Sequence, residues 1–235
     1  MRREVVFTLV AMCALMRAGY TEGEEFRFQV RHDHDFKSCR GKLAFSDQGV
    51  RFDTGHVKHA RDWHYKDIQQ VGLLGPSEIS IVTFEDRKWI AGKDLRFHFK
   101  LVEGTIPEQL NSFLRGKLTR PLVTSLLPAT QVSKFELPAK HLHALGGCQG
   151  VLKFGEESVS YLSNTPEDSR QWQYEELDSM GSTGQFQLRL TTLERTRSEI
   201  GGQKNFIFEL KSCMTPEMYD FVWWKVNRSK IAQIP

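Results

Sequence analysis

The sequence lacks a strong charge of either sign. Its 32 basic and 29 acidic side chains are interspersed and leave a net charge of +3. Proteins that bind nucleic acid carry a concentrated basic surface, so this composition argues against a nucleic-acid partner. The middle of the chain also lacks an apolar run long enough to span a bilayer. What remains is 40% hydrophobic and 26% charged, which is typical of one large or two small globular domains.

Motifs for catalysis are missing as well. The sequence contains no pattern typical of a hydrolase triad, a phosphate-binding loop or a cofactor fingerprint. We therefore expect a non-enzymatic protein that needs no cofactor and that binds or scaffolds another, unidentified macromolecule. The alternative is a metal-binding or thiol-dependent protein that uses the histidine and cysteine cluster described below, with zinc or copper as the ion.

The N-terminus has the pattern of a secretory signal. Arg2 and Arg3 provide a short basic start, and residues 5–16 form an apolar run. A run of this length is typical of a signal-peptide core and is too short for a membrane span. The pattern predicts a signal peptide over residues 1–19, cleavage near Ala18, and export to the periplasm or the medium. An uncleaved anchor and a misassigned start are the alternatives.

The strongest pattern is an internal repeat with a period of 109 residues. The stretch "HDHDFKSCRGKLAF" at 32–45 returns as "HLHALGGCQGVLKF" at 141–154, and the match continues without a gap through Trp63 and Trp172. A period of this length is that of a whole small domain rather than of a solenoid unit. The repeat predicts two homologous domains, joined by an extended, proline-containing linker. The predicted ranges are 24–120 for the first domain, 121–132 for the linker and 133–232 for the second domain.

Each unit is predicted to contain about seven short antiparallel strands and one C-terminal helix. Phe26, Phe28 and Val30 alternate with polar residues, as in a half-buried strand. Apolar residues recur at helical spacing after Pro107 and again after Pro216. This order of elements resembles the pleckstrin-homology superfold, in which two bent sheets form a partly open barrel with a helix at one end. The fold class expected is therefore mainly β, with two such barrels in tandem.

Two short motifs add to the resemblance. The stretches from Trp63 to Ile68 and from Trp172 to Leu177 read W-x-Y-x-[DE]-[IL], which resembles the fourth-strand region of bacterial members of the superfold. The His-x-His…Cys-x-Gly-x-Leu signature resembles uncharacterised exported bacterial proteins, a likeness that implies no activity. The superfold would place Cys148 and Cys213 at opposite ends of the barrel, so we predict no obligate disulfide, although the mature chain would keep an odd number of cysteines.

The repeated histidines and cysteine are the first candidate site. Their alternation places them on the inner side of the first hairpin, with Cys39 expected beside His34 and Gly41 beside His32. Two imidazoles and a thiolate can bind zinc or copper and leave one position open, but the sequence shows no obvious fourth ligand. A structural role in pinning the hairpin is the favoured interpretation, and a metal site or a reactive thiol are the alternatives. The candidate ligands are His32, His34, Cys39, His141, His143 and Cys148.

Three further features suggest partners. The resemblance places Arg61 and Arg170 near the open end of each barrel, as an anion or thiolate pocket or, more simply, as loop caps. Lys37, Arg40 and Lys42 make only the first hairpin basic, so phosphoinositide binding is not expected. The second helix carries an additional apolar stripe, which needs a covering surface. We expect that stripe to pack against the other domain, with an unidentified protein or envelope component as the alternative; it consists of Met218, Phe221 and Trp224.

Overall fold

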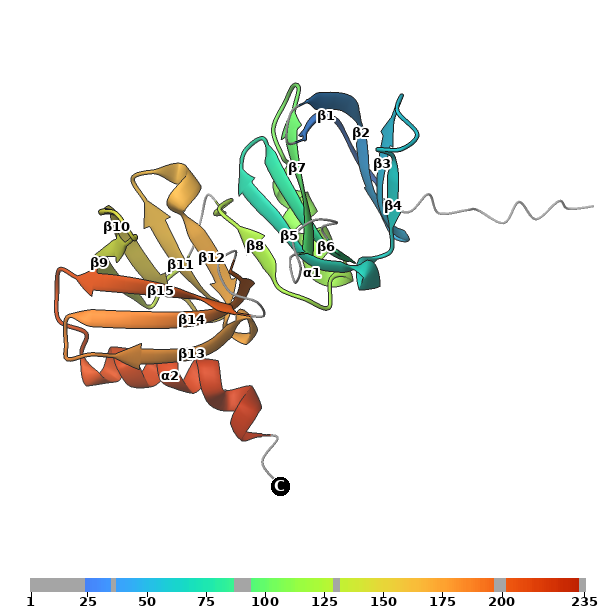
Figure 1. Ribbon diagram of the computed structural model, residues 1–235. Helices are drawn as coiled ribbons and strands as arrows, with labels where there is room; N and C mark the ends of the chain where they lie inside the picture. The colour runs from blue at the N-terminus through green and yellow to red at the C-terminus, as the bar shows by residue number, and fades with distance from the viewer. Residues whose placement is uncertain (1–23, 35–36, 87–93, 129–131, 197–201, 233–235) are drawn as a thin grey trace, which may run out of the picture.

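A mainly β architecture is seen in the computed structural model, which describes residues 24–34, 37–86, 94–128, 132–196 and 202–232. Fifteen strands in the described residues form one continuous hydrogen-bonded sheet, accompanied by two α-helices (Figure 1). The predicted signal peptide lies outside the described residues. Within them, no helix combines the length and the apolar character needed to cross a membrane.

The elements of the two halves follow the same order. The first half contains β1 (Phe26–Asp33), β2 (Ser38–Ser46), β3 (Gly49–Thr54), β4 (Arg61–Trp63), β5 (Ile68–Gly75), β6 (Glu78–Asp86), β7 (Asp94–Leu101) and α1 (Glu108–Lys117). The segment between the halves contributes β8 (Leu122–Thr124). The second half contains β9 (Phe135–Leu142), β10 (Gly147–Phe154), β11 (Ser158–Ser163), β12 (Arg170–Gln173), β13 (Leu177–Ser182), β14 (Gln187–Arg195), β15 (Gln203–Leu210) and α2 (Pro216–Ile231).

The 109-residue period is also visible in the pairing of the strands. In the first half the order across the sheet is β5-β6-β7-β1-β2-β3-β4, and in the second it is β13-β14-β15-β9-β10-β11-β12. Strands β1–β7 correspond in sequence to β9–β15, so the two halves have the same strand order. Every pair of strands inside a half is antiparallel. The sequence repeat is therefore a structural repeat.

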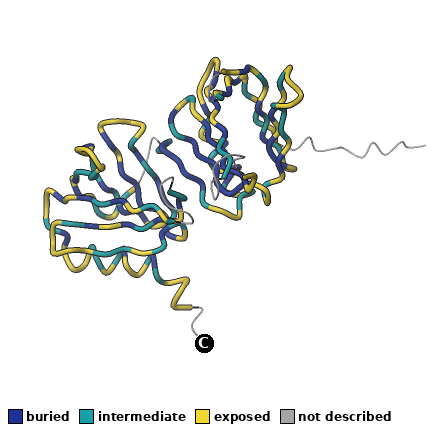
Figure 2. Tube along the Cα trace, in the orientation of Figure 1, coloured by how far each residue is buried: buried dark blue, intermediate teal, exposed yellow. Residues whose placement is uncertain are grey.

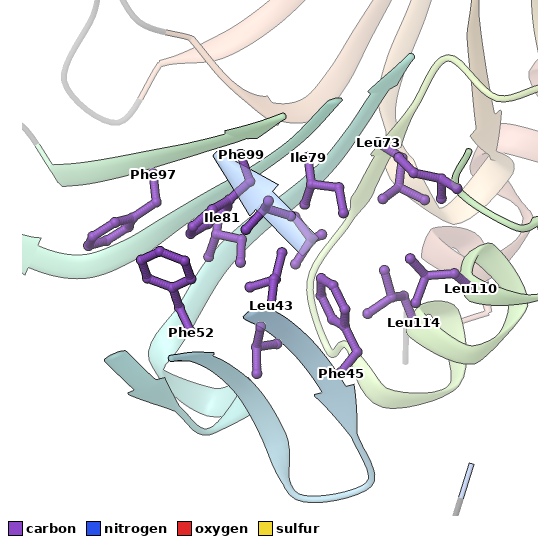
Figure 3. Close-up of a cluster of buried hydrophobic side chains, with 14 of the residues drawn as sticks. Leu43, Phe45, Phe52, Leu73, Ile79, Ile81, Phe97, Phe99, Leu110 and Leu114 are labelled. Carbon is purple, nitrogen blue, oxygen red and sulfur yellow. The ribbon is translucent and has the colours of Figure 1, made fainter. Parts of the chain in front are cut away.

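Each half encloses its own hydrophobic core. Burial alternates along the strands, as expected where one face of a strand packs inward (Figure 2). In the first half Leu110 and Leu114 of α1 point at Phe45 and Leu73 (Figure 3). The second core is formed by residues from the strands of the second half together with Val222 and Val226 of α2. The helix thus closes one side of each core, because its apolar positions recur on one face.

The W-x-Y stretches are structural in both halves. Trp63 Nε1 donates to Glu85 Oε1 at 3.0 Å, and Trp172 Nε1 donates to Glu194 Oε1 at 2.8 Å. The tyrosine hydroxyls of both stretches donate to backbone carbonyls at 2.8 Å. The predicted strand over this stretch is interrupted, because a 3₁₀ turn at Tyr65–Asp67 separates β4 from β5. After this turn the chain no longer pairs with β3, and β5 pairs with β6 and β8.

The segment between the halves contributes a strand that the sequence did not indicate. Within the predicted extended linker, β8 is a buried strand that pairs in parallel with β5 and antiparallel with β12. This strand merges the two sets of strands into one sheet (Figure 1). Arg115 of α1 adds an ion pair of 2.6 Å to Glu176, which also accepts a hydrogen bond from the backbone N–H of Leu122.

Helix α2 packs mainly within its own half. Its principal contacts are to β13 and to the 3₁₀ turn at Tyr174–Glu176 (Figure 1). Met218 and Phe221 of the predicted stripe pack beside the second core, with the Phe221 ring 5.6 Å from that of Phe135. These two residues of the stripe therefore pack within the second half, while β8 and Arg115 connect the two halves. Trp224 remains 56% exposed.

Candidate metal centres

Both candidate clusters lie where the first hairpin of each half turns. In the first half the hairpin pairs His32 with Cys39 and Asp33 with Ser38. The N–H of His34 donates to the carbonyl of Lys37 at 2.7 Å, which closes a tighter turn than expected. The predicted register, with Cys39 opposite His34 and Gly41 opposite His32, is therefore wrong by two residues. His34 nevertheless folds back toward the thiol as a diagonal neighbour.

The second half brings all three predicted ligands together. His143 Nε2 lies 3.0 Å from His141 Nδ1 and 3.5 Å from Cys148 Sγ, and Cys148 Sγ lies 3.9 Å from His141 Nδ1. A tetrahedral zinc ion would hold two ring nitrogens about 3.4 Å apart and a nitrogen and a sulfur about 3.6 Å apart. The three atoms therefore already sit close to the spacing that a bound ion imposes. We call this group the second centre.

The first half assembles a different ligand set. His34 Nε2 lies 3.2 Å from Cys39 Sγ, and a ring nitrogen of His59 lies within 4.8 Å of both. Nδ1 of His59 is buried and has no hydrogen-bond partner among the described residues. A buried polar atom without a partner costs free energy. We call His34, Cys39 and His59 the first centre.

His32 is the predicted ligand that does not join the first centre. Its side chain is buried against Phe97 and Phe99, and its Nδ1 lies 2.8 Å from the carbonyl of His98. That position corresponds to His141 of the second centre. Sequence reasoning missed His59 because the second half has no histidine there; the equivalent residue is Asp168.

Arg61 and Arg170 fix the loops that carry these residues. Arg61 Nη1 donates to the carbonyls of Lys58 and Ala60 at 2.8 Å each, on both sides of His59. Arg170 Nη1 makes the equivalent bonds to Glu167 and Ser169, at 2.8 and 2.7 Å, on both sides of Asp168. Both arginines therefore bind loop carbonyls, as expected if they cap the loops.

Burial disfavours the charged form of two imidazoles, those of His32 and His141. Desolvation lowers the pKa of His32, and the nearby His34 adds to this effect. Desolvation and the neighbouring His143 lower the pKa of His141 to about 4. A neutral imidazole has a lone pair free for a metal, because no proton has to leave first. Burial also raises the pKa of Tyr161, whose hydroxyl donates to the carbonyl of Cys148 at 2.7 Å.

The three described cysteines Cys39, Cys148 and Cys213 are free thiols. Cys39 and Cys148 are buried, at 7% and 6% exposure. Burial limits access of a large reaction partner, whereas a metal ion and a single water molecule are small enough to reach the hairpin. This favours metal ligation over a reactive-thiol role.

One further hollow lies between the halves. A cavity of about 440 Å³ is bounded by one face of α1, by the segment that follows β8 and by Gln171 and Gln173 of β12. Arg115 lines it, and its Nη2 is buried without a partner among the described residues. This cavity is separate from the two centres.

Similarity to known proteins is found among solved structures rather than among family models or curated proteins. No family model matches the chain, and no curated protein matches it. Among solved structures, the Spt16D–Pob3N heterodimer is similar at 12% identity and a TM-score of 0.28, covering 72% of this chain and 82% of that one. The Bacillus subtilis inhibitor of motility (MotI/DgrA) is similar at 9% identity and a TM-score of 0.16, covering 92% and 100%. TM-scores below 0.5 do not establish a shared fold.

Proposed function

We propose that this chain is a non-enzymatic protein that binds transition-metal ions at two related centres, one at the first hairpin of each half. The observation that carries the proposal is the second centre, where two imidazole nitrogens and a thiol sulfur lie 3.0 to 3.9 Å apart. Two nitrogens and a sulfur suit Zn²⁺ or Cu⁺ and are a poor set for Mg²⁺ or Ca²⁺.

Hydrogen bonding within each cluster is the competing explanation. A protonated His143 Nε2 could donate to His141 Nδ1 at the same 3.0 Å, and the ring tautomers are not fixed by the geometry. Such a network would pin the hairpin without any metal. The first half does not form a self-sufficient network, because Nδ1 of His59 is buried and has no hydrogen-bond partner among the described residues.

The organisation proposed around these centres is that of two pleckstrin-homology-like domains over 24–120 and 133–232, in an exported protein. Support comes from the matching strand order of the halves and from the helix that closes each core. A role as a binding scaffold is the second candidate function. It is favoured by Trp223 and Trp224 of α2, which are 40% and 56% exposed.

Metal titration of the full mature chain tests the first proposal. We expect the wild type to bind about two equivalents of Zn²⁺ in competition with a chromophoric chelator, and Co²⁺ to give thiolate-to-metal charge-transfer absorption at both centres. Cys39→Ser and Cys148→Ser should each lose one equivalent. Cys213→Ser is the matched control, since its thiol lies near Gln185 and outside both clusters. If the wild type bound no metal and the cysteine variants lost only stability, the metal proposal would be wrong, and the clusters would serve only to pin the hairpins.

The scaffold candidate needs a different measurement. If α2 docks a partner, Trp224→Ala should abolish co-purification of that partner from the native host, and Trp224→Phe should retain it. A wild type that purifies without any stoichiometric companion would argue against this candidate.

A further inference from the structure

The two centres differ at one position of the loop between the third and fourth strands of each half. His59 precedes β4 in the first half, and Asp168 stands at the same place in the second. The loops are built alike: the N–H of His59 donates to the carbonyl of His56 at 2.8 Å, and that of Asp168 to the equivalent Thr165 at 2.9 Å. With the arginine clamp described above, this gives residues 59 and 168 the same backbone placement.

His59 shows what this loop position can reach. Its ring nitrogen joins the first centre, within 4.8 Å of His34 and Cys39 ligand atoms. The carboxylate of Asp168 is shorter and stays outside the corresponding group. Asp168 is nevertheless half-buried beside the second centre, and its charge acts on both His141 and Tyr161.

The carboxylate of Asp168 has no competing partner. It forms no ion pair or hydrogen bond with any residue in the part of the chain that the structure describes. Arg170 binds the carbonyls of Glu167 and Ser169 and does not bind the side chain of Asp168. The Asp168 side chain can therefore turn toward a cation. A metal ion between His141, His143 and Cys148 would be one such cation.

We propose, resting on the metal-binding function above, that Asp168 supplies a fourth, oxygen ligand to the second centre and makes that centre selective for Zn²⁺ over Cu⁺. Zn²⁺ accepts carboxylate oxygen in a tetrahedral site, whereas Cu⁺ prefers soft ligands and gains little from a carboxylate. The first centre has only imidazole and thiolate ligands, so it binds both ions. Position 59/168 is thus, together with position 32/141, a position that distinguishes two centres derived from one repeat.

Each centre can be measured alone in the full chain. In a Cys39→Ser background only the second centre remains, and its affinities for Zn²⁺ and Cu⁺ are measured by competition with chelators of known affinity. Asp168→Ala should lower the Zn²⁺ affinity by about 10-fold or more and leave the Cu⁺ affinity within about twofold. Glu167→Ala is the matched control, because it removes an equal charge from the adjacent exposed position of the same loop.

A gain-of-function variant provides the second readout. Asp168→His recreates the ligand type of the first centre, so it should raise Cu⁺ affinity by about 10-fold and reduce the preference for Zn²⁺. Equal Zn²⁺ affinity for the wild type, Asp168→Ala and Glu167→Ala would overturn the assignment of Asp168 and leave the metal-binding proposal intact. If the Cys39→Ser background bound no Zn²⁺, both the assignment of Asp168 and the metal-binding proposal for the second centre would be overturned. Denaturation midpoints of all variants separate loss of a ligand from loss of the fold.

Discussion

Arg61 and Arg170 hold the backbone of the loops beside the two centres. Each guanidinium holds the two carbonyls that flank the loop residue, at 2.7 to 2.8 Å. We expect Arg61→Ala to lower the metal affinity of the first centre by about 10-fold, the range seen when residues that orient ligands are lost. The measurement is Zn²⁺ competition in a Cys148→Ser background.

Two comparisons separate positioning by Arg61 from a general loss of stability. Arg51→Ala removes an arginine whose side chain is 63% exposed on β3 and should leave the affinity unchanged. Arg61→Lys keeps the charge but loses the fixed fork of donors, so it should behave like Arg61→Ala. Equal affinities for Arg61→Lys and the wild type would mean that charge, and not the clamp, is what the first centre needs.

Among the secondary-structure elements, the duplication provides two equivalent hydrogen bonds from a tryptophan to a glutamate, and the two glutamates differ in burial. Trp63 donates to Glu85, whose side chain is 44% exposed, and Trp172 donates to Glu194, whose side chain is 6% exposed. We expect Trp172→Phe to destabilise the protein by about 1–2 kcal/mol more than Trp63→Phe, because only Glu194 is left buried without its donor. Urea denaturation of both variants tests this difference. Equal losses would show that ring volume alone decides the cost.

The same elements show what the sequence could and could not predict. The period of 109 predicted the repeated strands and the closing helices, because alternation and helical spacing are local properties of each unit. The hairpin register was missed, since it depends on the turn from His34 to Lys37. His59 was missed because its counterpart is an aspartate, and a search for repeated histidines excludes such a position. The pairing of β8 was missed because the segment between the units has no counterpart in the repeat.

In the whole molecule, Glu176 joins the halves. One oxygen of its carboxylate accepts from Arg115 Nη1 at 2.6 Å and from the N–H of Leu122 at 3.3 Å, and the other accepts from the N–H of Gln173 at 2.8 Å. The side chains of Glu176 and Arg115 are only 12% and 20% exposed. We expect Glu176→Ala to destabilise the protein by about 3 kcal/mol, because it leaves the Arg115 charge buried and unpaired. Glu175→Ala, which removes an exposed pair to Arg228, should cost at most about 0.5 kcal/mol.

The same carboxylate gives the junction between the halves a pH dependence of definite sign. Burial raises the pKa of Glu176 above its ordinary 4.5, and this effect outweighs the opposing charge of Arg115. Between the two pKa values the folded state binds more protons than the unfolded state, so the contribution of Glu176 to stability grows as the pH falls toward 4.5 and is lost as the pH rises through the folded pKa. Glu176→Gln removes the titration. The free energy of unfolding of the wild type, measured relative to Glu176→Gln, should therefore increase from pH 7 to pH 5; a decrease would mean that the Arg115 charge, and not burial, controls this carboxyl.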